Sequence, residues 1–169
     1  MNKLIWLMGL ILLLPGLLAF TGFKYNVTNS LAPGVYRVVN KLAMRGDYAW
    51  FCPPDNAAIR EALNRGYIQK GECAGGFIHF MKKVVATSGD KVTIDSSGVY
   101  VNDVLLDYSK PIDRDSQGRK LLINNLTNYR MGNDEYLMMT DCNDKSFDAR
   151  YFGIVKGVNI QKLDKVFTW

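Results

Sequence analysis

The chain has 169 residues, of which 48% are hydrophobic and 22% are charged, and its formal net charge is +5. This hydrophobic content excludes a disordered chain, and the length allows one membrane anchor and one domain with its own core. The single histidine, His79, excludes a multi-histidine metal site, and no glycine-rich phosphate loop or paired CxxC motif is present. No basic run is interleaved with aromatic residues, so we expect no nucleic-acid partner. From the missing metal and phosphate motifs we also expect no metal and no cofactor.

An apolar run from Leu4 to Phe23 is interrupted only by Pro15, Thr21 and glycines. About 20 such residues cross the hydrocarbon core of a bilayer as a helix. We therefore expect residues 1–24 to be an N-terminal transmembrane anchor, and residues 25–169 to form one domain beyond the membrane. The alternative is a cleaved secretory signal peptide, but the run is longer than a usual signal core.

The rest of the chain is predicted to be mainly antiparallel β structure, as a sheet or barrel, with one short helix. Asp55 is expected to cap a helix from Ala57 to Leu63 that ends before Gly66. The polar, turn-rich stretch 110–130 is expected to be a surface excursion. The predicted strands, of which the fourth and fifth form a hairpin, cover residues 35–39, 47–51, 77–87, 91–95, 99–106, 135–140 and 158–166.

Two cysteines, Cys52 and Cys73, flank the predicted helix, and Cys142 lies far from both. In an oxidising compartment Cys52 and Cys73 would form a disulfide that closes a loop around the helix. Three free thiols are the alternative, because spacing does not determine connectivity. A cysteine nucleophile is not expected, since no histidine or basic cluster lies beside any of the three in sequence.

One lysine is predicted to be buried. A serine hydroxyl needs a base to remove its proton, and a lysine can be that base if burial lowers its pKa from about 10.4. Side chains alternate between two faces of a strand, so Lys83 shares its face with the polar His79. The face of Lys82 is apolar and holds Ile78, Phe80, Val84 and Ala86. The alternative is that Lys82 and Lys83 are both ordinary charges at a sheet edge.

Three segments, in the expected order, resemble the characteristic boxes of signal peptidases. Thr28 to Gly34 resembles the nucleophile box, Met81 to Asp90 the lysine box, and Ser146 to Gly153 the last box, Ser-x-Asp-Ser-Arg-Tyr-x-Gly. The stretches Phe51-Cys52-Pro53-Pro54 and Cys73-Ala74-Gly75-Gly76 are similar to the TraF type, the conjugative-transfer peptidases that mature pilin. The resemblance implies a signal-peptidase-like β domain and a serine peptidase activity.

The resemblance also implies roles for individual residues. Ser30 is implied to be the nucleophile and Lys82 its general base. The backbone N–H of Ser30 and the hydroxyl of Thr28 are expected to stabilise the oxyanion.

The last box is implied to support this pair. Ser146 is expected to hydrogen-bond and orient the lysine, and Asp148 and Arg150 to pair on one strand face and hold the loop in place. A purely structural salt bridge is the alternative for this pair, and in the TraF type the matching aspartate acts more directly. The chain departs from the family pattern with Ala149 in place of serine and Ser88 in place of proline.

The short distance along the chain between anchor and nucleophile bears on the substrate. Ser30 follows Phe23 by seven residues, and an extended linker of that length reaches at most about 25 Å. We therefore expect a membrane-anchored serine endopeptidase, single-pass in the inner membrane with its catalytic domain in the periplasm, that works beside the lipid bilayer. Its expected substrate is a membrane-embedded precursor, in the first place conjugative pilin, with hydrolysis or head-to-tail cyclisation of the acyl-enzyme. The alternatives are a general leader peptidase and a non-catalytic pilus-assembly protein.

Overall fold

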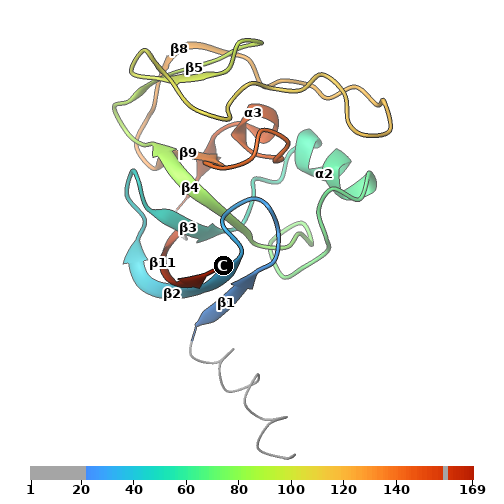
Figure 1. Ribbon diagram of the computed structural model, residues 1–169. Coiled ribbons are helices and arrows are strands. Elements are labelled where there is room, and N and C mark those ends of the chain that lie inside the picture. Colours follow the sequence, from blue (N-terminus) through green and yellow to red (C-terminus); the bar gives the residue numbers. More distant parts are fainter. Residues whose placement is uncertain (1–21, 158–159) are drawn as a thin grey trace, which may run out of the picture.

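The computed structural model describes residues 22–157 and 160–169 (Figure 1). The predicted anchor lies outside these residues except at its end, and within them no helix is long and apolar enough to cross a membrane. The boundary predicted at residue 24 falls inside the first strand, β1 (Phe23–Asn26).

The larger of two antiparallel sheets has seven strands in the order β1-β2-β11-β3-β4-β9-β10. It is open, with β1 and β10 at its edges, and it curls strongly (Figure 1). Strand β11 pairs with both β2 and β3, so the C-terminal strand completes the sheet as predicted. The remaining strands of this sheet are β2 (Gly34–Leu42), β3 (Tyr48–Phe51), β4 (Phe80–Ala86), β9 (Glu135–Met139), β10 (Val155–Lys156) and β11 (Gln161–Thr168). The prediction of a mainly β, antiparallel domain is confirmed.

The smaller sheet has four strands in the order β7-β6-β5-β8. Its strands are β5 (Lys91–Ile94), β6 (Val99–Val101), β7 (Val104–Leu105) and β8 (Leu126–Arg130). The predicted strand 99–106 is divided at Asn102 and Asp103, whose φ angles of 51° and 66° make a tight hairpin turn. The stretch 110–130 is not wholly an excursion, because its last five residues form β8 beside β5.

The helix α2 (Ala57–Asn64) is where the sequence predicted it. Its cap is Asn56, whose side chain accepts a hydrogen bond from the backbone N–H of Ile59 at 3.0 Å. The predicted cap, Asp55, instead forms an ion pair with Arg60 at 2.8 Å. The expected helix is present, but its first turn is stabilised by the residue after the one predicted.

A second short helix, α3 (Ala149–Phe152), corrects the prediction of a single helix. All four of its residues are buried, and it lies beside β9 between the two sheets (Figure 1). All five residues of β9 are buried as well. The main core includes side chains from β4, β9 and α3, so part of the last predicted box is itself a component of the core.

Candidate active site

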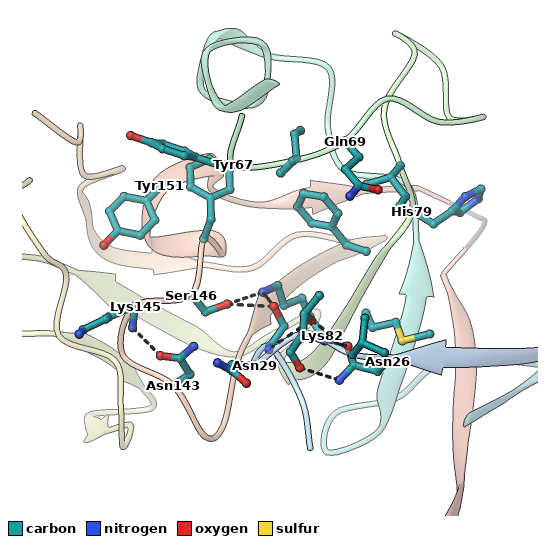
Figure 2. A pocket seen from close by; sticks show the side chains of 18 of the residues that line it. Asn26, Asn29, Tyr67, Gln69, His79, Lys82, Asn143, Lys145, Ser146 and Tyr151 are labelled. Carbon is teal, nitrogen blue, oxygen red and sulfur yellow. Dashed lines mark hydrogen bonds between the residues drawn. The ribbon is translucent and has the colours of Figure 1, made fainter. Parts of the chain in front are cut away.

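A groove with a volume of about 720 Å³ opens between the start of the larger sheet and the loops around α2 and α3. One wall is the nucleophile loop, which we define as residues 27–33 between β1 and β2. The start of β4 and the segment 143–147 line the groove next to it, and residues 67–69 form the opposite wall. Figure 2 shows that Lys82 and Ser146 point toward one another within this groove. The segments predicted to carry the chemistry thus share one cavity.

The structure brings together three residues that lie far apart in sequence, Ser30, Lys82 and Ser146. Lys82 Nζ lies 2.9 Å from Ser30 Oγ and 2.5 Å from Ser146 Oγ. The two hydroxyl oxygens are 3.3 Å apart. Each distance is within hydrogen-bonding range, so a proton can pass directly between the serine hydroxyl and the amine.

Burial changes the chemistry of Lys82. Its side chain is on the buried face of β4 and only 3% exposed. The pKa of Lys82 is lowered from 10.5 to about 8, mainly because burial removes the amine from water; the charge of Asp148 opposes this shift, and the charge of Arg150 adds to it. The amine is therefore neutral in a substantial fraction of molecules near neutral pH.

The alternation predicted along β4 is observed. Phe80, Lys82, Val84 and Ala86 are buried, whereas the residues between them are partly exposed. Lys83 is on the other face and forms an ion pair with Asp141 at 3.2 Å. Ile78 does not belong to the apolar face, because it precedes β4 and is 36% exposed.

Asp148 and Arg150 form a fully buried ion pair. Arg150 Nε and Nη2 donate to the two carboxylate oxygens of Asp148 at 2.7 and 2.8 Å. The pair was predicted on a strand face, but it lies at the start of α3, where Asp148 is the N-cap. Arg150 also donates to the backbone oxygens of Ser146 at 2.9 Å and of Asp144 at 2.7 Å. The pair therefore holds the loop that presents the Ser146 hydroxyl to the amine.

The two predicted oxyanion donors are neighbours in the nucleophile loop. The Ser30 N–H donates to Thr28 Oγ1 over a long 3.4 Å, and the Thr28 hydroxyl donates to Asn26 Oδ1 at 2.8 Å. The weak bond at Ser30 leaves its N–H ready to exchange this partner for an oxyanion. The Thr28 hydrogen is directed at Asn26, so Thr28 has to rotate before it can donate to substrate.

Two residues that the sequence analysis did not single out contact the nucleophile loop. Asn26, 4% exposed, lies at the end of β1, and Thr140, 2% exposed, follows β9. The order Asn26-x-Thr28 is typical of an Asx turn, so the local sequence could have predicted a contact between Asn26 and Thr28. No local sequence pattern predicts the role of Thr140, because its contact is with Ser30, 110 residues away in sequence.

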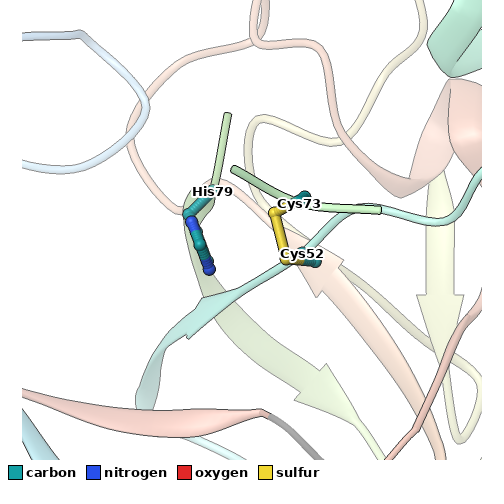
Figure 3. Close-up of side chains that lie close together, drawn as sticks. All are labelled: Cys52, Cys73 and His79. Atoms are coloured by element: carbon teal, nitrogen blue, oxygen red, sulfur yellow. A yellow bond between two sulfur atoms is a disulfide. The ribbon is translucent and has the colours of Figure 1, made fainter. Parts of the chain in front are cut away.

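Cys52 and Cys73 are joined by a disulfide (Figure 3). The loop that this disulfide closes contains α2. Cys142 is a free, exposed thiol. His79 lies near the disulfide, and its nitrogen and the two sulfur atoms are within 4.8 Å of one another. Because both sulfur atoms are bonded to each other, neither is available as the thiolate ligand that a zinc ion requires. His79 instead stacks on the ring of Trp50 at 4.7 Å.

Comparison with known proteins gives consistent relatives. The family described as "Signal peptidase, peptidase S26" matches residues 2–169. The plasmid transfer protein TraF of Escherichia coli is 41% identical over 162 residues, which cover 95% of this chain and 92% of that protein. A probable conjugal transfer protein TraF of Sinorhizobium fredii is 32% identical over 146 residues, or 85% and 76% of the two chains. Among solved structures, a signal peptidase I of Enterococcus faecalis aligns with a TM-score of 0.40 and 21% identity, covering 76% of this chain and 98% of that one.

Proposed function

Because the chain belongs to the peptidase S26 family of signal peptidases, we propose that it is a membrane-anchored serine endopeptidase in which Ser30 is the nucleophile and Lys82 the general base. The observation that carries the proposal is the 2.9 Å distance between Lys82 Nζ and Ser30 Oγ, at an amine that is removed from water. A lysine in that environment has the properties that a general base needs near neutral pH.

The reaction follows from the geometry. As Ser30 Oγ attacks the scissile carbonyl, the neutral Lys82 amine accepts the serine proton. The resulting ammonium group donates a proton to the leaving nitrogen when the C–N bond breaks, and an ester remains on Ser30. A water molecule or an amine then attacks the ester and gives a proton to Lys82, and Lys82 returns a proton to Ser30 Oγ as the ester bond breaks, which restores the hydroxyl and the neutral amine. Throughout, the Ser146 hydroxyl at 2.5 Å keeps the amine directed at Ser30.

Burial accounts for much of the reactivity of the base. With its pKa at about 8, Lys82 is neutral in about one molecule in ten at pH 7, compared with about one in 3,000 at the ordinary lysine value. The fraction of active base is therefore raised about 300-fold. An exposed lysine at the same distance would almost always be protonated and unable to accept the serine proton.

The substrate that we propose is a membrane-tethered precursor, in the first place conjugative pilin. Relatives that align with most of this chain are named as plasmid or conjugal transfer proteins TraF. The nucleophile loop directly follows β1, which begins at the end of the apolar run, and this short spacing supports a position of Ser30 beside the inner membrane. The disulfide supports that compartment, because disulfides persist in oxidising environments. Attack by water yields a cut chain, and attack by the substrate's own amino terminus yields a ring.

The test is processing of pilin in cells. The full-length chain and its Ser30→Ala, Lys82→Ala and Lys83→Ala variants are expressed with the pilin precursor of the same genome, and the products are weighed by mass spectrometry. Lys83→Ala is the matched control, since this neighbour faces away from the groove. We expect that only the unaltered chain and Lys83→Ala process the precursor. Where a ring forms, its mass should be lower than that of the linear cleaved product by one water.

Other results identify the alternatives. Normal processing by Ser30→Ala and Lys82→Ala would show that the peptidase proposal is wrong. Cleavage of a panel of unrelated exported precursors would indicate a general leader peptidase. A pilus that needs this chain, with pilin that the chain never cuts, would indicate an assembly protein.

A further inference from the structure

Two buried polar side chains other than Ser30 and Lys82 form hydrogen bonds with the backbone of the nucleophile loop. We propose that Asn26 and Thr140 are positioning residues that hold Ser30 Oγ against the Lys82 amine, one from each side of the loop. The proposal rests on the proposed function and concerns how the reacting atoms are kept in place. The loop needs such support because Val27, Thr28 and Asn29 all project into solvent.

Thr140 holds the nucleophile itself. Its hydroxyl donates to the backbone oxygen of Ser30 at 2.8 Å. Thr140 Oγ1 also accepts from the backbone N–H of Cys142 at 3.4 Å, and the Thr140 N–H donates to Asp148 Oδ2 at 3.3 Å. At 2% exposure Thr140 has no water to take the place of these partners. Its hydroxyl therefore fixes the peptide group of Ser30 to the rigid end of β9.

The contacts of Thr140 close a ring through the buried ion pair. Asp148 Oδ2 accepts hydrogen bonds from both the Thr140 N–H and Arg150 Nη2. Arg150 holds the backbone oxygen of Ser146, and the Ser146 hydroxyl lies against the Lys82 amine. Asp148 thus supports the residue that directs the base and also the residue that holds the nucleophile. This arrangement gives the fully buried carboxylate a physical link to both reacting groups without contact with either.

Asn26 holds the loop from the other side. Its amide nitrogen donates to the backbone oxygens of Leu31 at 2.9 Å, Thr28 at 3.0 Å and Ala32 at 3.3 Å. Its amide oxygen accepts from the Thr28 N–H at 3.1 Å and from the Thr28 hydroxyl at 2.8 Å. Asn26 therefore binds the loop before and after Ser30, whereas Thr140 binds it at Ser30. The two side chains share no partner, so neither replaces the other.

Loss of the hydrogen bonds from either Thr140 or Asn26 should lower the rate more than it weakens substrate binding, because a misplacement of about 1 Å at the reacting atoms costs about 100-fold in rate. The experiment compares Thr140→Val, which keeps the shape and removes the hydroxyl, with Thr140→Ser, which keeps the hydroxyl. Asn26→Asp keeps the accepting oxygen and removes all donors. Thr93→Val is the matched control, since it removes a hydroxyl that accepts a hydrogen bond in the smaller sheet.

The full-length variants are assayed in detergent micelles with the pilin precursor of the same genome. We expect Thr140→Val and Asn26→Asp to lower kcat about 10- to 100-fold, with KM changed less than about threefold. For Thr140→Val the pH at which the rate is half-maximal should not move, because this substitution changes no charge near Lys82. Thr140→Ser should recover at least about a third of the wild-type kcat, and Thr93→Val should match the wild type.

The proposal is overturned if folded Thr140→Val and Asn26→Asp both keep kcat within about threefold of wild type. It is also overturned if Thr140→Ser is as slow as Thr140→Val, because the loss then follows shape and not the hydroxyl. If Thr140→Val does not fold, judged by circular dichroism, the result for Asn26→Asp decides. An active Ser30→Ala would overturn the proposed function and this proposal together. An inactive Ser30→Ala beside fully active Thr140→Val and Asn26→Asp would overturn the positioning role alone.

Discussion

Replacement of Lys82 by methionine should make the folded chain more stable at neutral pH, although it removes the proposed base. The folded pKa of Lys82, about 8, lies below the ordinary value of 10.5 that applies in the unfolded chain. Below pH 8 the folded chain therefore holds a charged amine away from water. At about 1.4 kcal/mol for each pKa unit, this costs about 3 kcal/mol at pH 7.

The sign of the pH dependence follows from proton binding. Between pH 8 and 10.5 the unfolded chain binds more protons at Lys82 than the folded chain does, so the wild-type stability rises with pH across this window. Methionine has no charge to bury and carries no such dependence. The substitution also removes the contacts with Ser30 and Ser146, which offsets the gain by about 1–2 kcal/mol at every pH. We expect a net gain of about 1–2 kcal/mol at pH 7, which falls by about 2 kcal/mol at pH 9.5.

The assay is urea unfolding of the full-length chain in detergent micelles, followed by tryptophan fluorescence at pH 7.0 and 9.5. Lys83→Met, on the other face of β4, controls for the loss of a positive charge from the same strand. The quantity compared is the difference in unfolding free energy between wild type and Lys82→Met. If that difference stays the same within about 0.5 kcal/mol at both pH values, the amine is not desolvated and the reasoning is refuted.

Three further predictions concern the same site and its support. Activity should rise with pH up to about pH 8 and then level off as Lys82 becomes neutral. Lys82→Arg should be inactive at every pH, because a guanidinium stays protonated. A pH–rate profile that is the same in Lys82→Arg as in the wild type would contradict this. Replacement of both Cys52 and Cys73 by serine should lower the unfolding free energy by about 3 kcal/mol in a urea titration, since the disulfide closes a loop across 21 residues of sequence; an unchanged midpoint would contradict the entropic argument. Asp148→Asn should destabilise by about 3 kcal/mol or more, because it leaves the charge of Arg150 buried without its counterion. Thermal unfolding measures this loss, and a second substitution, Arg150→Met, should restore part of it; no restoration would show that the charge is not its cause.

The parts of the fold that could be predicted depend on local patterns. The burial of Lys82 follows from the alternation of β4, because the side chains of a strand point to opposite faces wherever the strand lies in the sheet. The hairpin of the smaller sheet and the position of α2 follow in the same way from turn residues and periodicity. Each of these depends only on neighbours in sequence.

The parts that could not be predicted depend on distant contacts. A helix of four residues, α3, is too short to show a helical period, so the sequence pattern predicts a strand pair for Asp148 and Arg150. Strand β8 has a mostly exposed pattern without alternation, and it is defined by its pairing with β5. Thr140 donates a hydrogen bond to the Ser30 carbonyl, and only the folded sheet brings these two residues together.

The most direct measurement of the central claim is to trap the covalent intermediate. The full-length chain is mixed with the pilin precursor, quenched in acid during turnover and digested with trypsin, and the fragment from Tyr25 to Arg37 is sequenced by mass spectrometry. We expect this fragment to carry the acyl half of the substrate on Ser30, and to carry none in Lys82→Ala. Accumulation of product with no adduct on Ser30, or with the adduct on the neighbouring thiol of Cys142, would contradict the account.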